Sequence, residues 1–197
     1  ALQIEYVEGR TLTQWMRDHP QPDLETVRNL IDQIAKGLQA FHRLEMLHQD
    51  LRPDNILIDA AGTVKLIDFG SASVAGVAEA TQLAERSTML GTPQYTAPEH
   101  FLWEEGTTRS DQFSLGVIAY QLLSGRLPYG AEVARCKSAA EQKRLKYASL
   151  LQTRRDVPVW VDGAIKKAVH PNPERRYEAV SEFLHDLRHP NRGFLAD

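Results

Sequence analysis

The sequence predicts an α+β protein that is mainly helical, with a few short strands. Apolar residues recur at steps of three and four over residues 24–41, which indicates a long amphipathic helix with one buried face. Over residues 111–123 apolar side chains surround the helix almost completely, as expected for a helix at the centre of a domain. Two β-type runs, 56–59 and 63–67, flank the turn residues 60–62 and predict a hairpin.

The N-terminal part predicts one strand and one short helix ahead of the long helix. Residues 2–7 form a short, apolar and β-prone run, which is typical of a strand. A short helix is expected over residues 12–16, and Pro20 prevents its continuation. Asp23 is a good N-cap for the long helix that follows, because its side chain can accept from an unpaired backbone amide.

The C-terminal part predicts a loop and three helices in addition to the buried one. Residues 70–86 are small and polar without a sustained period, which indicates a mobile loop. Gly125 is expected to end the buried helix. Further helices are expected over residues 137–152, 159–169 and 178–188, with prolines marking the breaks between them.

Composition limits the classes of function. The 197 residues fit one domain, and 23 Lys and Arg against 26 Asp and Glu give a net charge of −3, so nucleic acid is not an expected partner. No apolar run is long enough to enter a membrane directly, and a cytoplasmic location is the expectation. Cys136, as the one cysteine, excludes an internal disulfide. His185 and His189 lack a third ligand, so a structural or surface role is favoured over a metal site.

Three oxygen-bearing side chains carry the chemistry of this sequence. Asp50 lies in His48-Gln49-Asp50-Leu51-Arg52-Pro53-Asp54-Asn55, and Asp68 begins Asp68-Phe69-Gly70. Phosphoryl transfer from ATP requires one carboxylate to orient a hydroxyl nucleophile, and an amide oxygen and a second carboxylate to hold Mg²⁺. The hairpin over residues 56–67 is expected to place Asn55 and Asp68 so that both face the same ion.

These motifs resemble the protein-kinase signature H-R-D-L-x-x-x-N plus D-F-G. Residues 91–99 resemble the end of the kinase activation segment, G-T-x-x-Y-x-A-P-E, and Thr92 resembles the serine/threonine-directed branch. The likeness covers nearly the whole chain and is similar in character to bacterial eukaryotic-like serine/threonine kinases. It includes the type in which the kinase domain is joined to a phosphatase domain and a membrane anchor, so the resemblance is compatible with a membrane-anchored parent protein. It implies a kinase-like C-lobe with a hinge at 4–9, a catalytic loop at 48–55 and an activation segment at 68–99.

The resemblance implies a role for each matching residue. Asp50 would be the base, Arg52 would stand where the family has Lys and neutralise the transferred phosphoryl, and the Thr92 hydroxyl would bond to Asp50. ATP, Mg²⁺ and a protein substrate are the implied cofactors and partners. The residues that would contact the adenine are the gatekeeper Ile4, the carbonyl of Glu5, the amide of Val7 and the side chain of Leu57, while Asn55 and Asp68 would bind the metal.

The resemblance also implies two internal contacts. Glu99 is expected to form a buried ion pair with Arg176, although two surface charges would be the ordinary alternative. Asp111 lies at the start of the expected buried helix, where a negative charge is favourable whatever the function of the protein. In the family the matching residue also accepts hydrogen bonds from the backbone of the catalytic loop.

One departure from the family pattern concerns regulation. Gln49 replaces the Arg that usually pairs with a phosphorylated residue of the activation loop, for which Thr88 is the aligned acceptor. The neutral glutamine side chain cannot form an ion pair with phosphate, so control through a phosphate on Thr88 is not expected.

Two other classes of function compete with the active kinase. A pseudokinase or scaffold would keep the fold for partner binding, but Asp50, Asn55, Asp68 and Thr92 are all present. A small-molecule phosphotransferase would share these spacings but would lack the segment ending in Ala97-Pro98-Glu99. That segment favours protein substrates.

Nothing before Asp50 resembles a Gly-rich loop or a strand Lys of the V-A-I-K type, so the N-lobe is expected to be absent from these residues. The chain also begins at Ala1 rather than Met and is interpreted as a piece of a longer protein. Alone, it is expected to bind ATP weakly and to transfer phosphate negligibly. Apolar surface around Leu2 and Ile4 is expected to favour self-association of this piece.

Overall fold

The computed structural model describes residues 8–67, 73–74 and 93–195. Its helices are α1 (Leu12–Asp18), α2 (Leu24–Arg43), α4 (Thr108–Ser124), α5 (Ala139–Gln142), α6 (Val159–Ala168) and α7 (Val180–Arg188). Its strands are β1 (Arg10–Thr11), β2 (Met46–Leu47), β3 (Ile56–Ile58), β4 (Val64–Leu66) and β5 (Ser73–Val74). Single 3-10 turns complete it: η1 (Pro53–Asn55), η3 (Pro93–Tyr95), η4 (Pro98–Leu102), η5 (Val133–Arg135), η6 (Leu150–Gln152), η7 (Pro173–Arg175) and η8 (Arg192–Phe194).

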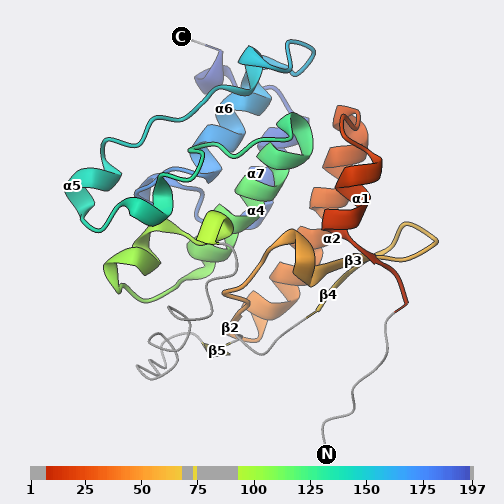
Figure 1. The fold of residues 1–197 in the computed structure, drawn as a ribbon, viewed down its shortest axis with the longest axis horizontal. Coiled ribbons are helices and arrows are strands. Elements are labelled where there is room, and N and C mark those ends of the chain that lie inside the picture. Colours follow the sequence, from red (N-terminus) through yellow and green to blue (C-terminus); the bar gives the residue numbers. More distant parts are fainter. Residues whose placement is uncertain (1–7, 68–72, 75–92, 196–197) are drawn as a thin grey trace, which may run out of the picture.

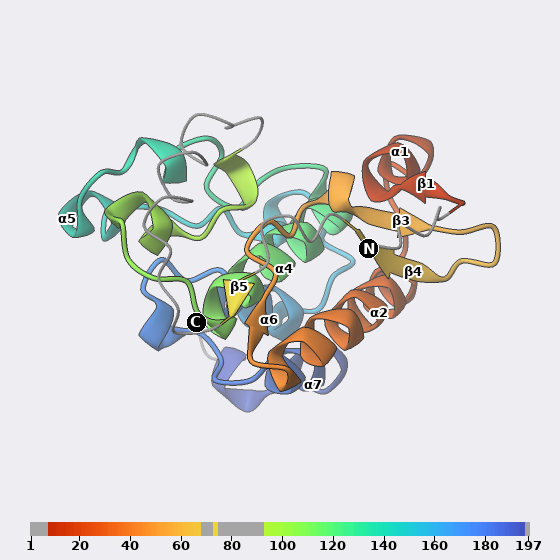
Figure 2. The same cartoon turned by 90° about the horizontal axis from the view of Figure 1, so that it is seen from below.

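Helices α2, α4, α6 and α7 pack together as the body of the molecule. The three-stranded sheet lies on one side of this body with α1, and the long connection that carries α5 lies on the opposite side (Figures 1 and 2). The expectation of a mainly helical α+β protein is therefore confirmed for the part of the chain that the structure describes.

Helix α4 forms the centre of the core. Its residues from Ser110 to Tyr120 are all buried, since α2 and α6 pack against it. The helix begins at Thr108, three residues before the predicted start, because Thr107 and Ser110 form a capping box that extends it. Gly125 ends it in the left-handed conformation at φ 66°, as predicted.

The predictions for the N-terminal half are confirmed where the structure describes them. Asp23 caps α2 by accepting a hydrogen bond from the Thr26 amide at 2.9 Å, and the apolar face of the helix is buried. The hairpin is also present, since Ile56 pairs with Leu66 and Ile58 with Val64 in antiparallel register. Helix α1 starts one residue after Thr11, which caps it. The predicted strand over 2–7 lies outside the described residues.

Three short strands were not predicted. Arg10 and Thr11 pair with Ile58 and Leu57, and β2 pairs with β5. Each has only two residues, too few to leave an alternating pattern in the sequence. The loop predicted over 70–86 lies outside the described residues apart from β5.

The prediction of a long helix over residues 137–152 is wrong. Only α5 and the turn η6 are helical there. Polar contacts to other elements hold the remainder in an irregular path, because the buried Asp162 carboxylate accepts from the hydroxyls of Tyr147 and Ser149 and from the amide of Leu150. At the other end Gln142 donates to the Pro98 carbonyl. Helices α6 and α7 confirm the two remaining predictions. None of the helices in the described part is long and apolar enough to cross a membrane.

Candidate active site

The predicted catalytic loop connects β2 to β3 through the turn η1. Pro53 occupies the first position of this turn, where its fixed φ is favourable and its missing amide hydrogen costs nothing. The turn closes with the Asn55 amide donating to the Arg52 carbonyl at 2.9 Å, and the Ile67 amide donates to the Asn55 carbonyl at 2.9 Å. Asn55 is therefore fixed where the hairpin begins, and it is 4 % exposed.

Asp50 and Asn55 contact each other directly. The Asn55 Nδ2 atom donates to the backbone carbonyl of Asp50 and to its Oδ2 atom, both at 2.9 Å. Because the amide nitrogen faces Asp50, the amide oxygen is the atom that can bind a metal. The Asp50 side chain remains 39 % exposed, so a substrate hydroxyl can reach it. The structure thus brings together two of the three side chains on which the predicted chemistry depends.

Arg52 lies beside this pair. Its Nε atom is 3.9 Å from Asp50 Oδ1, and the Arg52 side chain is 27 % exposed. A cation at this position can neutralise negative charge on a phosphoryl group near Asp50.

Asp111 holds the loop from the buried helix α4. Its Oδ2 atom accepts from the His48 amide and its Oδ1 atom from the Gln49 amide, both at 2.9 Å, which confirms the predicted contact. Gln49 adopts the left-handed conformation at φ 61°, which is unfavourable for a residue with a Cβ atom. The two hydrogen bonds from backbone amides to Asp111 stabilise this conformation immediately before Asp50.

His42 is a functional candidate that the sequence did not indicate. Its Nε2 atom lies 2.9 Å from Asp111 Oδ2, so the Asp111 carboxylate has three partners. A histidine in the last turn of a long helix is unremarkable in the sequence. The contact arises from the packing of α2 against α4, which the sequence does not reveal.

Substitution of Asp111 by Asn is expected to lower kcat, because the amide offers one acceptor oxygen where the carboxylate offers two. We expect about a 100-fold loss of kcat in the full-length protein, with a smaller change in KM for ATP. Steady-state phosphoryl-transfer rates measure it. Asp18→Asn is the control, since this exposed carboxylate at the end of α1 pairs with Arg10 on β1. Equal kcat values for wild type and Asp111→Asn would contradict the role.

The predicted ion pair between Glu99 and Arg176 is confirmed. Arg176 Nη1 and Nη2 donate to the two Glu99 oxygens at 2.8 and 2.7 Å, and the side chains are 0 % and 3 % exposed for Arg176 and Glu99. Burial raises the pKa of Glu99, but the hydrogen bonds and charge of Arg176 and the Ser110 hydroxyl outweigh it, so the net pKa lies below the ordinary value.

This pair fixes η4, the turn that follows Ala97, against the loop before α7. The turn η3 is fixed on α4 as well, since the Ser114 hydroxyl donates to the Tyr95 carbonyl at 2.7 Å and the Tyr95 hydroxyl donates to Gln121 at 2.5 Å. The end of the predicted activation segment is therefore attached to the core at several points.

Leu57 lies on β3 between two buried residues and is itself half-buried, which places it on the opposite face of the strand. The other residues predicted to bind ATP, the metal or Asp50 lie outside the described residues: Ile4, Glu5, Val7, Asp68 and Thr92. Thr88 lies outside them too.

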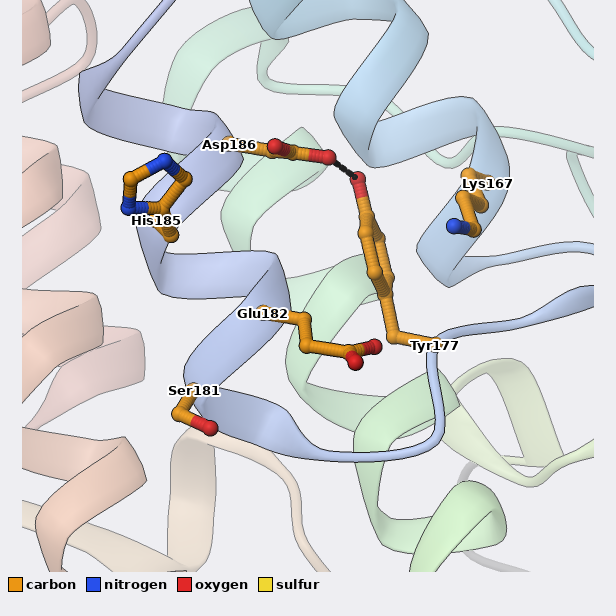
Figure 3. Close-up of a pocket in the computed structure, with 6 residues that line it drawn as sticks. All are labelled: Lys167, Tyr177, Ser181, Glu182, His185 and Asp186. Carbon is orange, nitrogen blue, oxygen red and sulfur yellow. Dashed lines mark hydrogen bonds between the residues drawn. The ribbon is translucent and has the colours of Figure 1, made fainter. Parts of the chain in front are cut away.

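A hollow of about 450 Å³ opens between α6 and α7 (Figure 3). The Tyr177 hydroxyl donates to Asp186 at 2.8 Å across it, and Lys167 Nζ lies 4.1 Å from the centre of the Tyr177 ring. His185 points away from the Tyr177 ring (Figure 3), and its own ring lies 4.4 Å from that of His189. These contacts tie the loop before α7 to both helices, which is a structural role.

Comparison with known proteins agrees with this geometry. Residues 1–188 match the protein kinase domain, so the chain belongs to the protein kinase family. It is 30 % identical over 185 residues to serine/threonine-protein kinase PrkC of Bacillus subtilis, covering 94 % of this chain and 28 % of PrkC. It is 31 % identical over 185 residues to serine/threonine-protein kinase PknB of Mycobacterium leprae, covering 93 % and 29 %.

A third relative is serine/threonine-protein kinase pkn2 of Myxococcus xanthus, which is 36 % identical over 138 residues, covering 68 % of this chain and 16 % of pkn2. The chain thus spans less than a third of the length of each of these curated relatives.

Proposed function

We propose that the chain is the larger lobe of a serine/threonine protein kinase that transfers the γ-phosphoryl group of ATP to hydroxyl groups of proteins. The observation that carries this proposal is the contact between Asn55 Nδ2 and Asp50 Oδ2 at 2.9 Å in a loop held by Asp111. It joins a candidate base to a candidate metal ligand in one rigid loop. The kinase family and the serine/threonine kinases among the relatives support it.

Some of the site residues position the reacting groups, and others compensate the charge of the phosphates. Asp50 accepts the proton of the substrate hydroxyl, and Arg52 beside it balances the charge of the phosphoryl group. Asn55 and Asp68 supply an amide oxygen and a carboxylate, which are the hard ligands that suit Mg²⁺. Bound there, Mg²⁺ would neutralise the phosphate oxygens. Ile4, Glu5, Val7 and Leu57 would hold the adenine ring, and Thr92 would bond to Asp50.

Protein substrates are favoured over small molecules by the segment ending at Glu99. Glu99 is held by Arg176, and the Pro98 carbonyl accepts from Gln142 at 2.7 Å. A segment held at these points suits an extended polypeptide. The second candidate, a pseudokinase scaffold, is disfavoured because Asp50 and Asn55 keep a geometry that a scaffold does not need.

The proposal is tested in the full-length protein, because residues 1–197 contain no recognisable Gly-rich loop or strand Lys to balance the phosphate charge. The protein is incubated with Mg²⁺, γ-labelled ATP and a mixture of acceptor proteins, and the labelled residues are identified. Label on serine or threonine is expected. No label on protein under any of these conditions, with Mg-ATP bound, would favour the scaffold instead.

A second prediction concerns regulation. Replacement of Thr88 by Ala is expected to leave kcat/KM of the full-length protein nearly unchanged, because the neutral Gln49 side chain cannot form an ion pair with a phosphate on Thr88. Kinetic assays of wild type, Thr88→Ala and Thr88→Glu measure it. A large loss in the Ala variant that the Glu variant restores would show that Thr88 is a control site.

A further inference from the structure

Gly106 lies in the segment that connects the turn η4 to helix α4. Its φ lies outside the left-handed region, so the backbone conformation itself does not require glycine. The space above its Cα atom does. A methyl group added to Gly106 would lie 2.8 Å from Cε1 and 3.3 Å from Nε2 of the His100 ring. The missing side chain of Gly106 therefore makes room for His100.

The same space borders the catalytic loop. The added methyl group would also lie 3.7 Å from the side-chain nitrogen Nε2 of Gln49, which is an ordinary van der Waals contact. The His100 ring and the Gln49 amide thus both approach the point where a side chain of residue 106 would begin. Gln49 immediately precedes Asp50. A branched side chain at position 106 would enter the space of both neighbours.

The segment around Gly106 is closed on itself by three contacts. The Ser110 hydroxyl donates to Glu99 at 2.7 Å, and the Glu104 amide donates to the Glu99 carbonyl at 3.1 Å. The Thr107 amide donates to the Ser110 hydroxyl oxygen at 2.9 Å. Because these contacts fix the backbone on both sides of Gly106, an added side chain would move its neighbours rather than the segment itself.

Gln49 is the neighbour whose position matters for chemistry. Its φ of 61° is unfavourable, and such a conformation persists only where the surrounding structure determines it. Asp111 fixes the backbone by accepting from the Gln49 amide at 2.9 Å. The open space over Gly106 admits the Gln49 side chain. The short stretch from residue 106 to residue 111 therefore determines both the backbone and the side-chain position of the residue before Asp50.

We propose that Gly106 is a positioning residue for phosphoryl transfer. Because it has no side chain, Gln49 and His100 pack over it, and this packing keeps the backbone at Gln49 and hence the Asp50 carboxylate in place. The effect on catalysis rests on the proposed kinase function, whereas the packing of Gln49 over Gly106 does not.

The variants Gly106→Ala and Gly106→Val of the full-length protein form a graded test. Alanine has to displace only the His100 ring, whereas valine also reaches the Gln49 side chain. We expect a small loss of kcat for the Ala variant and about a tenfold loss for the Val variant, with KM for ATP nearly unchanged. Gly193→Ala is the control, since Gly193 is exposed in η8 and its added methyl group would meet Asn191 Oδ1 at 3.3 Å.

Removal of the Gln49 side chain separates positioning from a general structural defect. Gln49→Ala leaves free space over Gly106, so Gly106→Val should lower kcat much less in this background than in the wild type. Equal losses in the two backgrounds would overturn the proposal. A wild-type kcat for Gly106→Val would overturn it as well.

Amide hydrogen exchange tests the same contact without catalysis. The amides of His48 and Gln49 donate to Asp111, and we expect both to exchange about tenfold faster in Gly106→Val than in the wild type, with the amides of α7 unchanged. Unchanged exchange at His48 and Gln49 would overturn the proposal. A wild-type protein that transfers no phosphate would reject the kinase function, and faster exchange in the variant would still support the packing of Gln49 over Gly106.

Discussion

Replacement of Arg176 by Met is expected to lower the free energy of unfolding by about 3–5 kcal/mol, since it leaves the Glu99 carboxylate buried without its cation. The expected loss is large because Arg176 also donates to the carbonyls of His170, Arg109 and Pro171. Its guanidinium lies 4.8 Å from the centre of the Phe113 ring as well. Denaturant unfolding of the two proteins measures the difference.

Arg135→Met is the matched control for this substitution. Arg135 pairs with Glu132 at 2.8 Å, but both side chains are exposed, and such surface pairs contribute about 0–1 kcal/mol. A loss in Arg176→Met no larger than in the control would contradict a buried ion pair. Replacing both Glu99 and Arg176 by apolar residues should cost less than the single change, because no charge is then left buried.

The same pair predicts a pH dependence. The pKa of Glu99 is lowered in the folded protein, so the stabilisation is fully present above its unfolded value near 4.5 and is lost as pH falls through the folded value. Wild type is therefore expected to lose stability below about pH 4.5 more steeply than the Arg176→Met variant. If the free energy of unfolding of the two proteins fell equally steeply with decreasing pH, the result would argue against the ion pair.

Substitution of Asp50 by Asn is expected to lower kcat of the full-length protein by about 10²–10⁴-fold, because the amide cannot accept the proton of the substrate hydroxyl. Binding of Mg-ATP should change little. The variant keeps its shape, since the Asn side chain still offers one oxygen to the Asn55 Nδ2 atom, which donates to Asp50 in the wild type. Single-turnover transfer measured beside ATP affinity separates the two effects.

Asp54→Asn serves as the control for that experiment. Asp54 lies in the same turn, but it is exposed and accepts from the Thr13 hydroxyl at 2.8 Å. The full rate is expected for this variant. Comparable rates in wild type and Asp50→Asn would require another group to act as the base.

An element of the fold could be predicted from the sequence when the residues that determine it lie within the element itself. The hairpin of β3 and β4 and the helices α2 and α4 could be predicted because their periodicity reports which face is buried. The segment 137–152 could not, since its path depends on polar contacts with Asp162 and Pro98 from distant parts of the chain.

The same division holds for the site. Asp50, Asn55 and Asp111 could be predicted from motifs with fixed spacing, and the contact between Glu99 and Arg176 from the family likeness. The contact of His42 with Asp111 could not be predicted, because it joins two residues 69 positions apart on different helices and belongs to no motif.

The position of Mg²⁺ in crystals of the full-length protein, grown with Mg²⁺ and a non-hydrolysable ATP analogue, tests the central claim most directly. We expect the Asn55 amide oxygen and an Asp68 carboxylate oxygen at about 2.1 Å from the ion. The Asp50 carboxylate should face the terminal phosphate. An ion bound by other residues, with the side chains of Asp50 and Asp68 directed into separate regions, would contradict the proposed phosphoryl-transfer site.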